Sequence, residues 1–265
     1  MPFIKRANAT VAYDIVGTGP TVLLGHSLFC TRSMWDGVIA ELKDEYRFIN
    51  IELRGHGEST AESDFVIDDL VDDWLAILEE ESVDRAILCG LSTGGMTAMR
   101  LALQSPDLVL GLALLDTNAD RQPYGERLQY AVLSWAYRHL GVLPRKALLQ
   151  GMYSRDTIVN RPQITQAFLR QLRDSDRRQL GRAMEAVFGR TAVDLGPLRC
   201  PTLVIVGEHD HSTPPPCARA IAEAVHGARL ETIAGAGHLT TVERPQSVAN
   251  LLRPFFAHCA TDLHQ

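Results

Sequence analysis

Short apolar runs alternate with amphipathic segments along this chain, and this alternation constrains the fold more than any other feature. Residues 86–89 and 108–115 are almost wholly apolar, and a similar run returns at 201–206. Residues 64–78, in contrast, repeat their apolar side chains at helical spacing, with acidic residues on the other face. Strands that are apolar on both faces need helices on both faces, which is typical of a parallel sheet. The sequence therefore predicts an α/β protein.

The middle of the chain has a different pattern from the parts that flank it. Its apolar residues recur at helical spacing, with one stripe through Leu128, Val132 and Trp135 and a second through Leu180 and Met184. Such stripes indicate the packed faces of helices. No part of this middle has the pattern of a strand, so we expect an all-helical insertion.

We therefore divide the chain into three parts. Residues 1–120 form the first part of an α/β core, residues 121–196 an inserted helical lid, and residues 197–265 the second part of the core. An insertion between two strands of such a sheet is expected to lie over the carboxyl ends of the strands, where ligands bind.

Composition excludes several classes of partner. The chain has 265 residues, with 26 Lys and Arg against 32 Asp and Glu, and no basic run that could follow nucleic acid. Its apolar runs are much shorter than the ~20 residues of a membrane span, and its first residues lack the apolar region of a signal peptide. The five cysteines are odd in number and never spaced Cys-x-x-Cys, so we expect reduced, buried thiols. We expect a cytoplasmic protein without nucleic-acid or membrane partners.

The segment Gly90-Leu91-Ser92-Thr93-Gly94 carries the strongest chemical signal. It directly follows one expected strand and directly precedes an expected helix. A strand that turns sharply into a helix forces its turn residue into a strained conformation, and small residues two positions away let the backbones pass. The helix N-terminus favours developing negative charge. Ser92 is therefore the candidate nucleophile, with a glycine-rich packing turn as the alternative interpretation.

A serine hydroxyl is a weak nucleophile, so this hypothesis requires a base and a group that orients the base. Asp210 lies in a loop just after an expected strand, and His238 lies in a loop after the next one. The chain order Ser92, Asp210, His238 differs from the orders of the chymotrypsin and subtilisin triads. Asp116, which directly follows the expected strand 108–115, is the alternative acid.

With these motifs in place, the chain resembles α/β-hydrolase fold proteins over essentially its whole length. The segments that carry the resemblance are residues 25–28, 54–59, 90–94, 207–214 and 237–238. The resemblance implies a mostly parallel central sheet with helices on both faces and an inserted helical lid. It also implies an oxyanion hole made by the backbone N–H groups of Leu28 and Thr93. Ser27 departs from the family pattern, because glycine is usual at this position.

The early loop narrows the resemblance further. Ser27-Leu28, followed by Met34-Trp35-Asp36, is similar to the early loop of bacterial 3-oxoadipate enol-lactone hydrolases and of related esterases. The serine at the turn argues against the branches with an aspartate nucleophile, haloalkane dehalogenases and epoxide hydrolases. This similarity to the enol-lactone hydrolases does not extend to the insertion, so it does not identify the substrate. The candidate substrate-binding residues there are large and apolar, with core packing as the alternative for each: Trp135, Phe168, Met184 and Phe188.

Together these features predict a cofactor-independent serine hydrolase that cleaves a small carboxylic ester or lactone through an acyl-enzyme. His209 and His211 flank Asp210, but alternate loop residues point in different directions and no further ligand spacing occurs, so we expect no metal. Two alternatives stay open: a C–C bond hydrolase or perhydrolase with the same triad, and a non-enzymatic small-ligand receptor of the same fold. The sequence does not indicate the oligomeric state.

Overall fold

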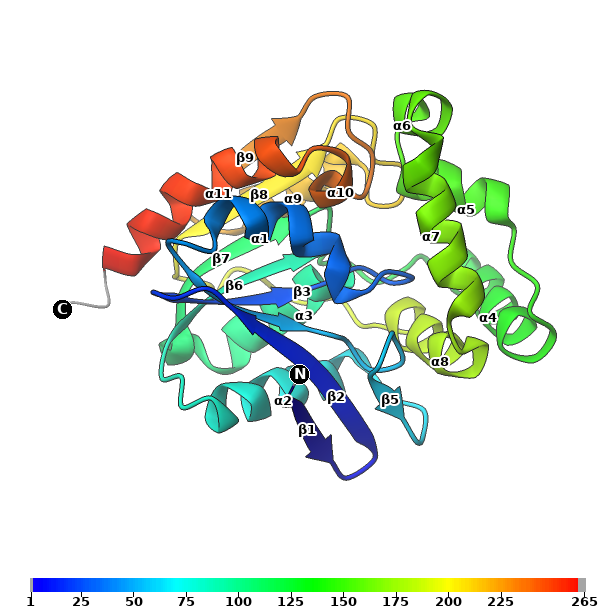
Figure 1. Ribbon diagram of the computed structural model, residues 1–265, viewed down its shortest axis with the longest axis horizontal. Coiled ribbons are helices and arrows are strands. Elements are labelled where there is room, and N and C mark those ends of the chain that lie inside the picture. Colours follow the sequence, from blue (N-terminus) through cyan, green and yellow to red (C-terminus); the bar gives the residue numbers. More distant parts are fainter. Residues whose placement is uncertain (1, 262–265) are drawn as a thin grey trace.

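A twisted sheet of nine strands forms the centre of the computed structural model, which describes residues 2–261 (Figure 1). The strands are β1 (Phe3–Arg6), β2 (Ala9–Val16), β3 (Thr21–Gly25), β4 (Arg47–Ile51), β5 (Thr60–Ala61), β6 (Ala86–Leu91), β7 (Val109–Leu115), β8 (Thr202–Gly207) and β9 (Arg229–Ile233). Their order in the sheet is β1-β2-β4-β3-β6-β7-β8-β9, and β5 pairs with β2. The pairs that involve β2 are antiparallel, whereas all pairs from β4–β3 to β8–β9 are parallel.

Helices cover the sheet on both faces, which explains why its central strands are apolar throughout. Every residue of β6, β7 and β8 is buried. The helices of the core are α1 (Asp36–Leu42), α2 (Ile67–Glu80), α3 (Thr93–Gln104), α9 (Pro215–Ala224), α10 (Thr240–Glu243) and α11 (Pro245–Ala260), with short 3-10 turns η1 (Arg32–Trp35) and η2 (Pro106–Leu108). α1 and α11 pack together on one face, and α2 and α3 on the other (Figure 1).

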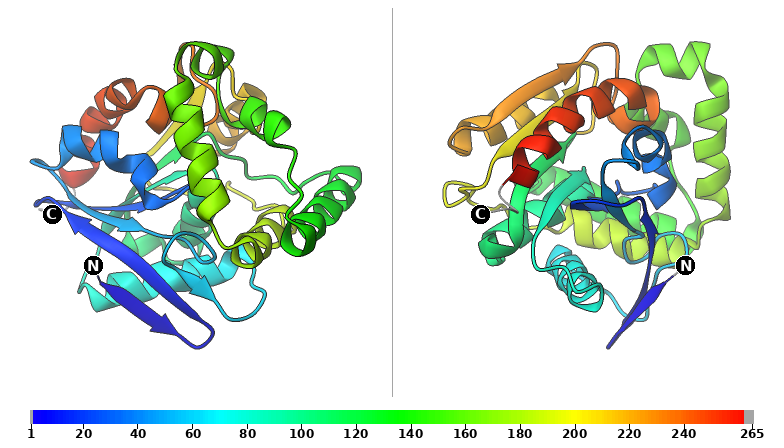
Figure 2. Two further views of the ribbon diagram at one scale, coloured as in Figure 1. Left: turned by 45° about the vertical axis from the view of Figure 1, so that its right-hand side comes forward. Right: turned by 60° about the vertical axis from the view of Figure 1, so that its left-hand side comes forward.

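Five helices follow β7 before the chain returns to the sheet at β8. They are α4 (Tyr124–Leu140), α5 (Arg145–Met152), α6 (Arg155–Asn160), α7 (Pro162–Asp174) and α8 (Arg177–Phe188). Figures 1 and 2 show them gathered at one end of the sheet, as a layer beyond the strand ends. The parallel strands β6, β7 and β8 all end at the same edge of the sheet, and this layer covers that edge.

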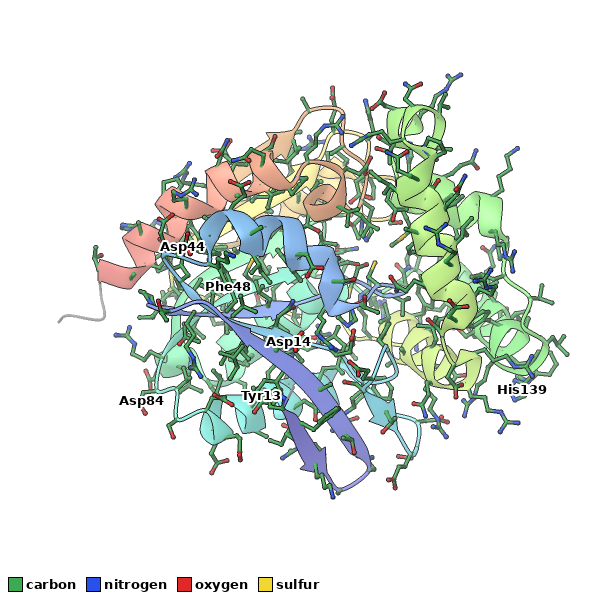
Figure 3. All side chains as sticks on the ribbon, viewed as in Figure 1. Tyr13, Asp14, Asp44, Phe48, Asp84 and His139 are labelled. Atoms are coloured by element: carbon green, nitrogen blue, oxygen red, sulfur yellow. The ribbon has the colours of Figure 1, made fainter. Side chains whose placement is uncertain are left out.

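The apolar stripe expected on α4 does not pack as the sequence predicts. Leu128, Val132 and Trp135 are 65%, 61% and 54% exposed, and the buried residues of α4 are Ser134 and Tyr137. α4 packs on α8 along this other side, where Gly181 permits close approach: a Cβ there would lie 2.7 Å from Cβ of Arg138. His139, one turn after Trp135, lies at the outer edge of the molecule (Figure 3).

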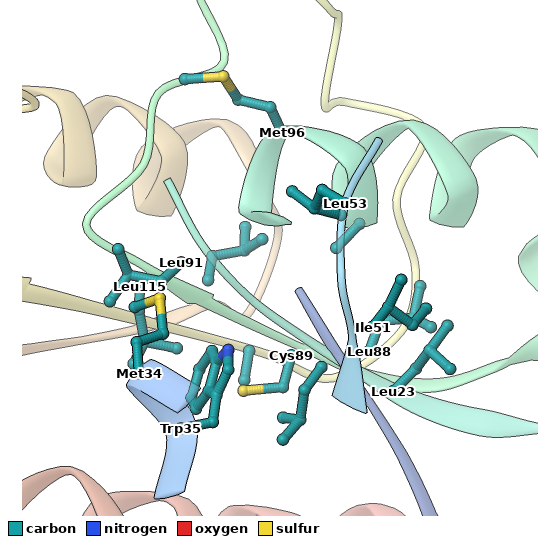
Figure 4. Packing of buried hydrophobic residues seen from close by; sticks show 14 of the residues in the cluster. Leu23, Met34, Trp35, Ile51, Leu53, Leu88, Cys89, Leu91, Met96 and Leu115 are labelled. Carbon is teal, nitrogen blue, oxygen red and sulfur yellow. The ribbon is translucent and has the colours of Figure 1, made fainter. Parts of the chain in front are cut away.

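The hydrophobic core lies between the sheet and the helices that cover it. Trp35, Leu23 and Cys89 belong to one fully buried cluster drawn from η1, β3 and β6 (Figure 4). All five cysteines are free thiols, but burial is incomplete at Cys200 and Cys217, in contrast to the sequence expectation.

Within residues 2–261, no helix is both long and apolar enough to cross a membrane. The cytoplasmic location expected from the sequence stays a prediction.

Candidate active site

Ser92 lies on the turn between β6 and α3 in a strained backbone conformation. Its φ is 53° and its ψ is −109°, a combination that residues with a side chain rarely adopt. A Cβ on Gly90 would lie 2.2 Å from the carbonyl carbon of Gly94, and a Cβ on Gly94 would lie 2.1 Å from the carbonyl oxygen of Gly25. Side chains do not fit at these two positions. The glycines around Ser92 are therefore required by the close passage of α3 over the sheet.

Asp210 and His238 are brought together from two neighbouring loops. Asp210 follows β8 and His238 follows β9, and His238 Nδ1 lies 2.9 Å from Asp210 Oδ2. The two loops touch because glycine stands in both. A Cβ on Gly207 would lie 2.0 Å from the carbonyl oxygen of Gly237. This close contact of the two loops lets the carboxylate reach the imidazole.

The Asp210 carboxylate is held by its own loop. Its Oδ1 accepts hydrogen bonds from the N–H groups of Ser212 at 2.8 Å and Thr213 at 3.0 Å. Its Oδ2 accepts the Thr213 hydroxyl at 2.8 Å as well as the His238 ring nitrogen. Because Oδ2 accepts the hydrogen bond from the ring, Nδ1 of His238 carries the hydrogen and Nε2 is left as the basic nitrogen.

Opposing effects act on the pKa of His238. Burial lowers it, because a charged ring is poorly solvated there, but the charge and hydrogen bond of Asp210 raise it more. Asp116 and Glu243 add negative charge nearby and act in the same direction. The pKa of His238 therefore lies above the ordinary value of 6.5.

Asp116, the alternative acid, is buried close to this pair without bonding to the histidine. It directly follows β7 with a φ of 44°, and its carboxylate accepts the Gly207 N–H at 2.8 Å and the Thr240 hydroxyl. Burial, reinforced by the negative charge of Asp210, raises the pKa of Asp116 well above its ordinary value. Of the two carboxylates, only Asp210 makes a hydrogen bond to His238 within the described part of the chain.

Ser92 and His238 line one cavity, which has a volume of about 290 Å³. The sheet side of its wall includes Leu28, and most of the side formed by the insertion is apolar. This size and character suit a small, largely apolar molecule. The apolar side chains from the insertion include Leu133, Leu148, Val187 and Phe188.

Of the four candidate substrate-binding residues, the structure brings one to this cavity. Phe188 lines it and stacks on Tyr130, with ring centroids 4.1 Å apart. Met184 is fully buried inside the insertion, and Phe168 lines a separate groove between α7 and the core. Trp135 stacks on His139 at the outer surface. Helical spacing identifies an apolar stripe but not the direction in which it faces. The sequence analysis therefore did not identify Tyr130 and Leu133, which line the cavity from the inner side of α4.

Of the two residues whose backbone groups are implied as oxyanion-hole donors, Thr93 directly follows Ser92 in the chain and Leu28 lines the same cavity. Thr93 is the first residue of α3, a position whose N–H has no carbonyl partner within the helix. Leu28 lines the cavity with Ser92. The preceding loop is held by His26, whose Nε2 accepts the Leu53 N–H at 2.9 Å. Ser27, which replaces the usual glycine, is buried, and its backbone N–H donates to the Met34 sulfur at 3.3 Å.

The histidines beside Asp210 diverge as the sequence predicts. His209 is half-exposed and lies 3.8 Å from Glu208, whereas His211 lines the cavity. Among the residues that the structure describes, no group of three or more His, Cys, Asp or Glu side chains is arranged to hold a metal ion.

Known proteins share both the sequence pattern and this architecture. A sequence model of the alpha/beta hydrolase family matches residues 21–251. The 3-oxoadipate enol-lactonase 2 of Acinetobacter baylyi is 27% identical over 234 residues, which cover 86% of this chain and 85% of the relative.

Solved structures agree with this family match. A thermophilic esterase from Thermogutta terrifontis has a TM-score of 0.93 at 26% identity, covering 98% of this chain and 100% of that chain. The enol-lactonase from Burkholderia xenovorans has a TM-score of 0.87 at 27% identity, covering 97% of this chain and 100% of that chain. The predicted fold class and the likeness to esterases and lactonases are thus confirmed. The chain belongs to the alpha/beta hydrolase family.

Proposed function

We propose that this carboxylic ester hydrolase is a serine enzyme that cleaves a small ester or lactone through an acyl-enzyme intermediate. The observation that carries the proposal is the single cavity lined by the strained Ser92 and by His238, which is itself bonded to Asp210. Esterases and enol-lactonases among the similar proteins support the same bond type.

In the first half of the reaction, Ser92 Oγ attacks the carbonyl carbon while His238 Nε2 takes the hydroxyl proton. The N–H groups of Leu28 and Thr93 stabilise the negative oxygen of the tetrahedral intermediate. Asp210 stabilises the imidazolium. His238 then gives the proton to the leaving alkoxide oxygen as the carbon–oxygen bond breaks, which leaves the acyl group on Ser92.

In the second half, water replaces the leaving alcohol. His238 takes one proton from the water, its oxygen attacks the acyl carbon, and the tetrahedral intermediate collapses with return of the proton to Ser92 Oγ. In a lactone the alcohol stays attached to the acyl chain, so one hydroxy acid is released. None of these steps needs a cofactor or a metal ion.

A panel of chromogenic esters and lactones of graded size, combined with a fluorophosphonate probe, tests this proposal. We expect turnover of small esters or lactones and covalent labelling of Ser92. A 1,3-diketone and a peroxide assay in the same panel examine C–C hydrolysis and perhydrolysis. Tight binding of a small ligand with negligible turnover and no labelling would contradict the proposal and favour a receptor.

Hydrolysis is expected to fall as the pH is lowered, with a midpoint above pH 6.5. The base must be neutral to act. Asp210 raises the pKa of His238 above its ordinary 6.5, so the base is protonated, and the enzyme inactivated, at a higher pH than for an ordinary histidine. The measurement is kcat/KM for one ester between pH 5 and pH 9. An acidic midpoint below 6.5 would show that another group controls the profile.

Acyl-chain preference is expected to depend on Phe188 and not on Trp135. Phe188→Ala enlarges the cavity, so the ratio of activities on longer and shorter acyl esters should rise about tenfold. Trp135→Ala, at the outer surface, should leave this ratio within about twofold. Both ratios are measured on variants with a native circular dichroism spectrum. A larger change from Trp135→Ala would place the substrate elsewhere.

A further inference from the structure

Glu243, the last residue of α10, carries a carboxylate that is fully buried beside the proposed base. Its Oε1 accepts the Gly237 N–H at 2.8 Å. Its Oε2 accepts the Ser154 N–H at 3.1 Å, the Ser154 hydroxyl at 2.6 Å and the Thr157 hydroxyl at 2.5 Å. Both oxygens of this carboxylate thus accept hydrogen bonds from buried donors.

The donors to Glu243 come from two parts of the molecule. Gly237 directly precedes His238, whereas Ser154 and Thr157 form the N-terminal turn of α6 in the insertion. The contact is close, because a Cβ on Gly237 would lie 2.4 Å from the Ser154 nitrogen. Glu243 therefore joins the loop of the base to the insertion at one point.

A second bond ties the loop on the other side of the histidine. The Leu239 N–H donates to the carbonyl oxygen of Met152 at 3.2 Å, and Met152 lines the catalytic cavity. The residues before and after His238 are thus both fastened to the stretch between α5 and α6. In the loop that carries Asp210, the Ser212 hydroxyl likewise donates to the carbonyl oxygen of Gly151 at 3.0 Å.

We propose that Glu243 is a positioning residue: its buried carboxylate fastens the Gly237–Leu239 loop to the insertion and so holds His238 in place for Ser92. This inference rests on the proposed serine mechanism. Glu243 does not touch the reacting atoms and acts through the backbone of Gly237. A misplacement of the base by about 1 Å is enough to cost on the order of 100-fold in rate.

The charge of Glu243 gives the proposal an independent readout. On the insertion side it faces the Arg161 guanidinium at 3.9 Å, and on the other side the charged neighbours of His238 are Asp210 and Asp116. The negative charge of Glu243 raises the pKa of His238. Loss of that charge should therefore move the acidic midpoint of activity to lower pH, an effect that a simple loss of folded protein cannot produce.

Glu243→Gln is the decisive variant, with Glu223→Gln on the exposed side of α9 as the matched control. Rates are expressed per active site, titrated with the fluorophosphonate. For Glu243→Gln we expect kcat to fall about 10- to 100-fold, KM to change much less, and the acidic midpoint to move to lower pH. The control should match the wild type in all three quantities.

Ser154→Ala separates the bond from the charge. It removes one hydroxyl donor and leaves the carboxylate charged, so kcat should fall by a smaller factor while the pH midpoint stays near that of the wild type. If Glu243→Gln does not fold, Ser154→Ala still tests the inference. In that event an unchanged kcat per site in Ser154→Ala overturns the inference.

Two failures can be told apart. Wild-type protein without turnover or labelling overturns the proposed function, and the role of Glu243 with it. An active wild type with a Glu243→Gln variant of unchanged kcat per site and unchanged pH midpoint overturns only the inference, whatever its melting temperature.

Discussion

Ser92→Ala is expected to abolish turnover, with kcat reduced by about 10⁶-fold, the order found when a triad serine is removed. Alanine keeps the Cβ and the main-chain bond from residue 92 to the Leu115 carbonyl, so the turn should survive. What is lost is the only oxygen that the mechanism uses to hold the acyl group. The measurement is hydrolysis of the best chromogenic ester in the panel.

The control for this experiment is Ser247→Ala, which removes an exposed serine hydroxyl from α11. It should keep full activity and full fluorophosphonate labelling, while Ser92→Ala shows neither and retains a native circular dichroism spectrum. Substantial activity in folded Ser92→Ala protein would end the serine mechanism.

Asp210→Asn is expected to cost up to ~10⁴-fold in kcat, by analogy with the same change in protease triads. The amide keeps the shape of the side chain but removes the charge that stabilises the His238 imidazolium 2.9 Å away. An activated aryl ester should show a smaller loss, because its leaving group needs less help from the acid.

Asp116→Asn should cost much less than Asp210→Asn when both are measured on one ester. Its carboxylate bonds to Gly207 and Thr240 instead of the imidazole, and burial already disfavours its charge. The larger loss falling on Asp116 would show that it, and not Asp210, orients the base.

Local sequence determined the central strands of this fold and the identity of the candidate nucleophile. Buried parallel strands have to be apolar on both faces, so β6, β7 and β8 are visible as runs of apolar residues. The turn at Ser92 needs glycine on both sides for steric reasons, so five consecutive residues predict it. Both signals depend on neighbours in the chain, which a sequence contains directly.

Only the tertiary structure shows which of Asp210 and Asp116 bonds to His238. Both residues follow buried strands, and both are buried near His238. The contact between the Gly207 and Gly237 backbones brings the Asp210 loop onto the histidine, while Thr240 and Gly207 occupy the Asp116 carboxylate. Which carboxylate bonds to the imidazole depends on how two loops pack, and spacing along the chain does not contain that information.

The orientation of the insertion and the surroundings of Glu243 were also decided by tertiary structure. The stripe through Leu128 and Trp135 has the period of a helix, but the close contact of α4 with α8 at Gly181 turns that stripe to the outside. Glu243 looks like any acidic residue in the sequence, since its donor Ser154 lies 89 residues away. A helical period does not say which face will be covered, and a buried carboxylate is identified only by the donors that folding brings to it.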